Sequence, residues 1–155
     1  MCRMLAARAP TGTDLTEVLL RFRKQGAASA TGPESERHHR DGWGIVAFGR
    51  GRERLFVRRP TDASTDDAYE AAVRTIAGFT EPLVIVHFRN ASVGNLRREN
   101  SHPFGYDGWW FAHNGTIKDM EKLELRGATY EGDTDSERYF RKLVRSLRVD
   151  APPRA

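Results

Sequence analysis

Leu83-Val84-Ile85-Val86-His87-Phe88 is an almost uninterrupted apolar run. A short apolar run without alternation predicts a strand that is covered on both faces. Such a strand needs more than one layer of partners, because each face must be buried against another element. Residues 83–88 therefore favour an α+β or α/β sandwich.

Further strands are expected on both sides of this run. Residues 43–50 and 53–58 predict two strands, and Gly51-Arg52 between them predicts a hairpin. Residues 2–8 and residues 109–113 predict two shorter strands. Hairpin and crossover connections are thus mixed in one chain.

Three segments repeat apolar residues with helical spacing, namely residues 14–24, 65–79 and 136–148. Ser64 and Asp67 resemble a capping pair at the start of the second helix. In the third helix we expect Tyr139, Phe140, Leu143, Val144 and Leu147 to face inward, and Arg138, Arg141, Lys142, Arg145 and Arg148 to face outward.

The bulk properties suit one soluble domain. The 155 residues predict a domain over residues 1–150 and a Pro-containing tail over residues 151–155. We see no apolar run of membrane-spanning length and no signal peptide, and the single cysteine cannot form an intrachain disulfide; a cytoplasmic location is expected. The net charge is +4, but the basic residues are scattered among acids, so nucleic-acid binding is not favoured.

Cys2 is the only cysteine and follows the initiator methionine. If Met1 is removed, Cys2 carries both a thiol and an α-amine, whose pKa near 8 lets it act as a base. One residue could then supply both the nucleophile and its base. The alternative is an ordinary buried cysteine in a first strand, since cysteine is often buried.

Two oppositely charged residues are candidates for binding a small zwitterion. Arg89 follows the apolar strand, and its planar guanidinium matches a carboxylate. Asp135 lies in Asp133-Thr134-Asp135-Ser136-Glu137 and could hold an ammonium group. The alternatives are a surface arginine and a helix start in which Thr134 and Glu137 form a capping box.

Two glycine-containing motifs complete the pattern. In His113-Asn114-Gly115, the Asn114 side chain and the Gly115 N–H could converge on a developing oxyanion, although Asn-Gly is also a common turn. In Asp41-Gly42-Trp43-Gly44, two glycines bracket an aromatic residue before a strand, which a turn and a core tryptophan would also explain.

The five histidines do not favour a metal site. With one cysteine and no His-Glu-x-x-His motif, the chain offers little basis for zinc. We expect His87, His102 and His113 to make local hydrogen bonds, and His38 and His39 to lie exposed in a loop.

Taken together and in this order, these motifs resemble the class II (N-terminal nucleophile) glutamine amidotransferases. The resemblance covers residues 2–137 and rests on Cys2, Asp41-Gly42-Trp43-Gly44, His87-x-Arg89-x-Ala91-Ser92, Asn100-x-His102-Pro103-Phe104, His113-Asn114-Gly115 and Thr134-Asp135-Ser136-Glu137. Met1-Cys2-Arg3 followed by Asp-Gly-Trp-Gly is similar to the stand-alone branch, which includes γ-glutamyl hydrolases.

The resemblance implies a four-layer αββα sandwich and a role for each candidate residue. Cys2 would attack the side-chain amide of glutamine or a related γ-glutamyl amide. Asn114 and Gly115 would form the oxyanion hole, Arg89 would bind the α-carboxylate and Asp135 the α-ammonium. The resemblance implies no metal and no organic cofactor.

Three functions remain open at this point. The chain could hydrolyse γ-glutamyl amides by itself, deliver ammonia to a synthase partner as a glutaminase subunit, or bind a γ-glutamyl ligand without turnover. Stand-alone members of the branch are longer, so the chain could be a compact member with a shortened sandwich, a fragment, or part of a larger assembly. A fragment would expose apolar sheet surface and favour a homo-oligomer or a partner subunit.

Overall fold

The computed structural model describes residues 2–27, 39–92, 94–119, 122, 127 and 129–149. Its elements are β1 (Arg3–Arg8), α1 (Thr16–Ala27), β2 (Trp43–Gly49), β3 (Arg52–Arg59), α2 (Asp67–Ala77), β4 (Leu83–Phe88), the 3-10 helix η2 (Arg98–Asn100), β5 (Phe104–Tyr106), β6 (Trp109–Phe111) and α3 (Asp135–Val149). Helices and antiparallel strands in one unit confirm the α+β class. The predicted tail lies outside the described residues, as does His38.

The predicted apolar strand is β4, which lies inside a four-stranded antiparallel sheet of order β1-β4-β2-β3. Val84 and Val86 are fully buried on one face of this strand. On the other face, His87 is fully buried, Ile85 is half-buried and Leu83 is exposed. Coverage of both faces is therefore complete only at the Phe88 end of β4.

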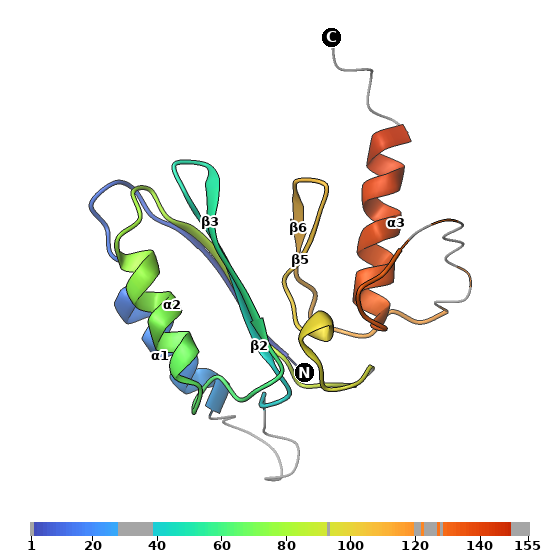
Figure 1. The fold of residues 1–155 in the computed structure, drawn as a ribbon, viewed down its shortest axis with the longest axis horizontal. Helices are drawn as coiled ribbons and strands as arrows, with labels where there is room; N and C mark the ends of the chain where they lie inside the picture. Colours follow the sequence, from blue (N-terminus) through green and yellow to red (C-terminus); the bar gives the residue numbers. More distant parts are fainter. Residues whose placement is uncertain are drawn as a thin grey trace.

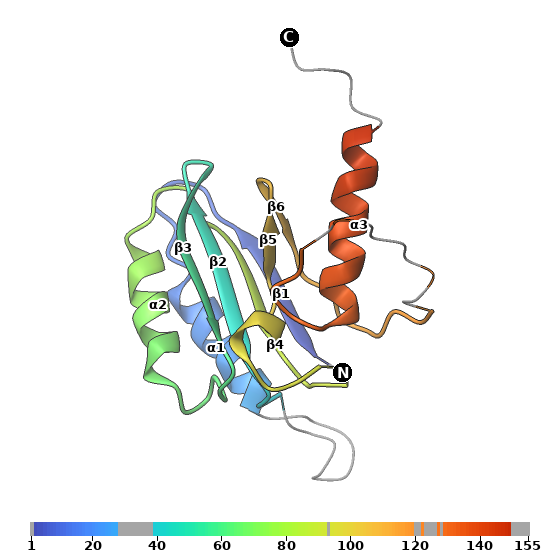
Figure 2. The same ribbon diagram turned by 45° about the vertical axis from the view of Figure 1, so that its right-hand side comes forward.

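The helices and the second sheet lie on opposite faces of the four-stranded sheet (Figure 1). Helices α1 and α2 cover one face, while the β5–β6 hairpin lies on the other face, with α3 beyond it. The turned view shows the same succession of layers (Figure 2). Among the described helices, none is long and apolar enough to cross a membrane.

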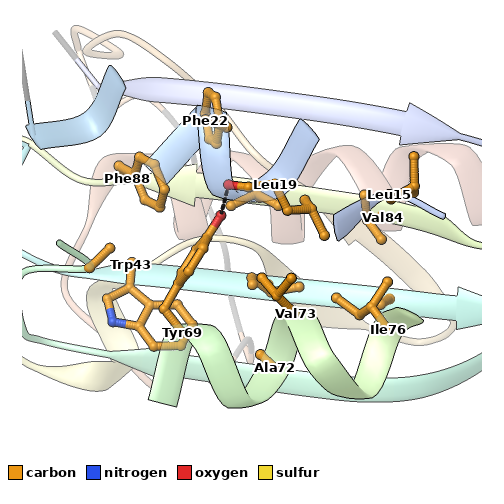
Figure 3. Packing of buried hydrophobic residues seen from close by; sticks show 14 of the residues in the cluster. Leu15, Leu19, Phe22, Trp43, Tyr69, Ala72, Val73, Ile76, Val84 and Phe88 are labelled. Carbon is orange, nitrogen blue, oxygen red and sulfur yellow. Dashed lines mark hydrogen bonds between the residues drawn. The ribbon is translucent and has the colours of Figure 1, made fainter. Parts of the chain in front are cut away.

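The main core lies between the two helices and the sheet (Figure 3). Its aromatic residues pack closely, and the Phe22 and Phe88 rings are stacked with centroids 4.7 Å apart. The Tyr69 hydroxyl donates a hydrogen bond to the Leu19 carbonyl at 3.0 Å, which ties α2 to α1. This packing fixes the buried end of β4, from which the candidate site begins.

Two predicted local features shift by one or two residues. The hairpin is confirmed, but its turn is Arg50-Gly51, where both residues have positive φ. The cap of α2 is Asp66, whose carboxylate accepts from the Ala68 N–H at 3.0 Å; the prediction of Ser64 was wrong. Aspartate is as good a cap as serine, so composition alone does not choose between them.

The predicted inner face of α3 is partly wrong. Phe140 and Val144 are buried, as expected, but Tyr139 and Leu147 are exposed. Arg141 faces inward instead, with its guanidinium carbon 3.9 Å from the Tyr106 ring centroid. The β5–β6 hairpin offers an aromatic face that stacks on a guanidinium, and this tertiary contact is not encoded in the helical period.

Candidate active site

Residues from widely separated parts of the chain meet in one small pocket. It is lined by Cys2, Arg89, Asn90, Ala91, Ser92, His102, His113, Gly115, Thr134, Asp135 and Ser136. Four of the five predicted site residues are in that lining, and the fifth, Asn114, contacts Cys2 directly. The cavity volume is about 20 Å³, which is room for about one water.

Cys2 is held at the head of β1 by the chain that follows β4. Arg3 pairs with Phe88, so Cys2 lies beside the residues after that strand. Its Sγ accepts from the Asn90 N–H at 3.3 Å. Burial raises the pKa of the Cys2 thiol, while the Asn90 backbone and the Arg89 charge act in the opposite direction. At neutral pH this thiol therefore needs a base before it can act as a nucleophile.

Arg89 extends from the end of β4 and is only 3% exposed. Its guanidinium donates to the carbonyls of Asn95 at 3.0 Å and Gly94 at 3.1 Å. Burial lowers its pKa, and the Asp41 carboxylate counteracts this effect. Because an arginine remains protonated in proteins, the pocket retains a fixed, oriented positive charge.

The Asp41-Gly42-Trp43-Gly44 motif is structural and supports the loop after β4. The Asp41 carboxylate accepts from the Ala91 N–H at 2.7 Å. A Cβ at Gly44 would collide with the His102 carbonyl oxygen, so glycine here lets residues leading into the second sheet lie directly on β2. Trp43 is a fully buried core residue. Trp43 and Gly44 thus fit the packing interpretation, while Asp41 also supports the loop that lines the pocket.

The His113-Asn114-Gly115 turn follows β6 and lies against Cys2. The Asn114 side-chain amide donates to the Cys2 carbonyl at 3.0 Å. The His87 Nε2 lies 3.2 Å from the His113 carbonyl oxygen. Gly115 has φ +152°, a conformation that L side chains rarely adopt. The turn therefore places an amide group against the Cys2 backbone and Gly115 in the lining of the same pocket.

Asp135 is the first residue of α3 and is 7% exposed. Its two carboxylate oxygens accept from the N–H groups of Ile117 at 2.6 Å and Ser136 at 2.8 Å. These bonds orient a carboxylate in the pocket, where it can face a cation.

The expected capping box is only half formed. Thr134 Oγ1 accepts from the Glu137 N–H at 3.3 Å, as a cap should. The buried Glu137 carboxylate, however, accepts from the N–H groups of Gly132 at 2.7 Å and Glu131 at 3.0 Å. Glu137 thus holds the segment that leads into α3, which places Asp135.

Some of the predictions for the histidines are confirmed and others are wrong. His87 and His113 make local contacts as expected, but neither ring nitrogen of His102 has a hydrogen-bond partner in the described part of the chain. Its ring instead lies against the His87 ring in a tilted arrangement, with centroids 4.3 Å apart and 35° between the ring planes. His39 is buried, so its predicted exposure was wrong. Among the described residues, no group of three or more His, Cys, Asp or Glu side chains could hold a metal ion.

Sequence reasoning missed three contributors to the pocket. Asn90 acts through its backbone N–H, which leaves no trace in residue type. Ser136 adjoins a predicted residue but had no role assigned, although its hydroxyl lies 3.0 Å from the His113 Nδ1. His102 was quoted as part of a motif, and its burial beside His87 depends on how the second sheet packs.

The comparison with protein families agrees with this arrangement. The family model described as class-II glutamine amidotransferases matches residues 1–155. The chain therefore belongs to the class-II glutamine amidotransferase family.

Curated relatives carry related names. A protein of Escherichia coli strain K12 named "Putative glutamine amidotransferase YafJ" is 29% identical over 95% of this chain and 55% of its own length. A Haemophilus influenzae protein named "Putative glutamine amidotransferase" is 31% identical over 90% of this chain and 46% of its own length. The chain thus spans about half the length of these relatives. A Francisella tularensis protein named "Glutamine--fructose-6-phosphate aminotransferase [isomerizing]" is 32% identical over 44% of this chain and 12% of its own length.

Proposed function

We propose that this protein hydrolyses the side-chain amide of glutamine or a related γ-glutamyl amide through a Cys2 thioester. The observation that carries the proposal is the pocket itself: Cys2, Arg89, Gly115 and Asp135 line one cavity although they are spread over most of the sequence. A thiol, a fixed cation, a carboxylate and a donor turn are the groups that this reaction needs.

The charges of the pocket match the two ends of the substrate's amino-acid group. In the proposed complex, Arg89 binds the α-carboxylate with its planar fork of donors. Asp135 binds the α-ammonium, because both of its oxygens are already oriented by backbone N–H groups. The γ-amide carbon then points toward Cys2.

The thioester forms and breaks with a balanced exchange of protons. The Cys2 α-amine, exposed once Met1 is removed, takes the thiol proton while Sγ attacks the amide carbon. The Asn114 side chain and the Gly115 N–H stabilise the oxyanion. The C–N bond breaks, and the amine leaves with the proton. A water then adds to the thioester carbonyl and releases glutamate and the Cys2 thiol.

A second candidate is a glutaminase that delivers ammonia to a synthase. The match to a relative named as a glutamine–fructose-6-phosphate aminotransferase favours it, because that name couples glutamine to a second substrate. In that case the same pocket would act, with little turnover until a partner binds. The four-layer N-terminal-nucleophile sandwich is proposed for both candidates.

The test is glutamate release from glutamine by the Met1-processed protein and by Cys2→Ser. A serine hydroxyl in the same place is a far weaker nucleophile, so we expect turnover to fall by at least a thousandfold. Equal turnover in both proteins would contradict the proposal. Release only in the presence of a second protein would favour the glutaminase subunit, and no release under any condition would favour a binding module.

A further inference from the structure

The geometry points to His113 as a positioning residue. It holds the Asn114-Gly115 turn, the proposed oxyanion hole, in place relative to Arg89 and Asp135. This inference rests on the proposed function. His113 immediately precedes Asn114 and Gly115, and contacts from two different elements fix it. The first element is β4, which ends just before Arg89, and the second is α3, which begins at Asp135.

The first contact comes from β4. His87 is fully buried, and its Nε2 lies 3.2 Å from the His113 carbonyl oxygen. A carbonyl can only accept, so His87 carries its proton on Nε2. This bond fixes the backbone of the turn to the strand whose end holds Arg89.

The second contact comes from α3. His113 Nδ1 lies 3.0 Å from the Ser136 hydroxyl, and that hydroxyl lies 3.3 Å from Asp135 Oδ1. A carboxylate accepts only, so the arrangement that satisfies all three groups has Nδ1–H donating to Ser136 and Ser136 donating to Asp135. The imidazole is thereby linked to the predicted ammonium-binding carboxylate.

Gly115 adds a steric requirement to the same ring. A Cβ at Gly115 would lie 3.1 Å from His113 Nε2, which is tighter than most real contacts. The ring therefore packs directly against the backbone whose N–H is the proposed oxyanion donor. A change in ring position shifts that donor, while Arg89 and Asp135 keep their own hydrogen bonds.

Ser136→Ala tests this role because it removes the hydroxyl that joins His113 to Asp135, while the Asp135 carboxylate keeps its bonds from the Ile117 and Ser136 N–H groups. Both the formation and the hydrolysis of the thioester pass through an oxyanion, so a displaced turn should lower kcat whichever step is slower. We expect kcat for glutamine to fall about five- to tenfold, with KM changed by less than about twofold. Thr75→Ala is the matched control, since its hydroxyl bonds the Ala71 carbonyl on α2, away from the pocket.

A double-mutant cycle with His113→Asn separates positioning from general destabilisation. Because the two side chains share one hydrogen bond, the double variant should lose about as much kcat as the worse single variant. Independent, multiplicative losses would overturn the inference, as would a folded Ser136→Ala protein with the wild-type kcat. If the wild-type protein releases glutamate, these results judge His113 alone; a wild type that is inactive and unreactive at Cys2 overturns the inference together with the proposed function.

Discussion

Cys2 is held in a setting that suppresses its reactivity until a base is present. Burial raises the pKa of its thiol, and the Asn90 N–H and the Arg89 guanidinium only partly oppose that effect. A thiol with a raised pKa is protonated at neutral pH and attacks slowly. The proposed α-amine base would therefore be needed for turnover, which links activity to removal of Met1.

His87 and His102 are a second residue-scale feature, because both are buried where a positive charge is costly. Burial lowers the pKa of His87 to about 3 and that of His102 well below its usual value. Their ring centroids lie 4.3 Å apart, so a charge on one ring would also disfavour a charge on the other. Both side chains are therefore neutral in the folded protein at physiological pH.

This burial predicts a loss of stability in mild acid. In the unfolded chain a histidine takes up a proton below pH 6.5, whereas folded His87 does not until about pH 3. The free energy of unfolding should thus fall as pH drops from 7 to 5, by about 2 kcal/mol from His87 alone, with His102 adding in the same direction. Urea unfolding at several pH values measures this change.

The pH range of the stability loss distinguishes a contribution from histidines from a contribution from carboxylates. Asp66 and Asp133 have lowered pKa values, so they cost stability only below about pH 4. A His87→Gln variant, which keeps a donor for the His113 carbonyl, should show a shallower decline between pH 7 and 5. An equal free energy of unfolding at pH 7 and pH 5 in the native sequence would contradict this account.

At the scale of elements, the site depends on how closely the second sheet approaches the first. Gly44 in β2 lies under the His102 carbonyl, with no room for a side chain. Phe104, two residues after His102, begins β5, so this contact fixes where the second sheet starts. The same residues carry His102 into the pocket lining.

Gly44→Ala tests that contact. The new Cβ must displace backbone, so we expect the free energy of unfolding to fall by about 3 kcal/mol. Gly78→Ala is a matched control, because its Cβ would meet Thr75 O at an ordinary 3.6 Å and its φ is −83°. That variant should change stability by less than about 1 kcal/mol. Equal denaturation midpoints for the two variants would show that the sheets are not packed as described.

Elements were more predictable from the sequence than their contacts. The apolar run at residues 83–88 coincides with β4, because continuous hydrophobicity is a local property. The inward side of α3 was less predictable: Arg141 stacks on Tyr106, while Tyr139 remains exposed. Helical periodicity ranks faces by apolarity and carries no information about an aromatic partner on another strand.

The candidate site was predictable where chemistry requires a side chain, and less so where it uses the backbone. Cys2, Arg89 and Asp135 carry distinctive groups, and all three line the pocket. The N–H of Asn90, which contacts the sulfur, could not be inferred from residue type. The link through Ser136 depends on the placement of α3 against β6, which only the tertiary structure gives.

At the scale of the whole molecule, the pocket joins the first described residue to segments that follow β4. Cys2 immediately precedes β1 and Arg89 immediately follows β4, whereas Gly115 lies in the turn after β6 and Asp135 begins α3. The layers drawn in Figure 1 are thus the reason that these residues meet. The activity proposed here belongs to this assembled state, and unfolding any layer should abolish it.

The most direct measurement is the intact mass of the purified protein after incubation with a diazo-ketone analogue of glutamine. Because Cys2 is the only cysteine, Cys2→Ser removes every thiol and serves as the control. We predict loss of the initiator methionine, one adduct mapped to Cys2, and slower labelling when glutamine competes. A folded, Met1-processed protein that stays unlabelled at Cys2 would contradict the central claim.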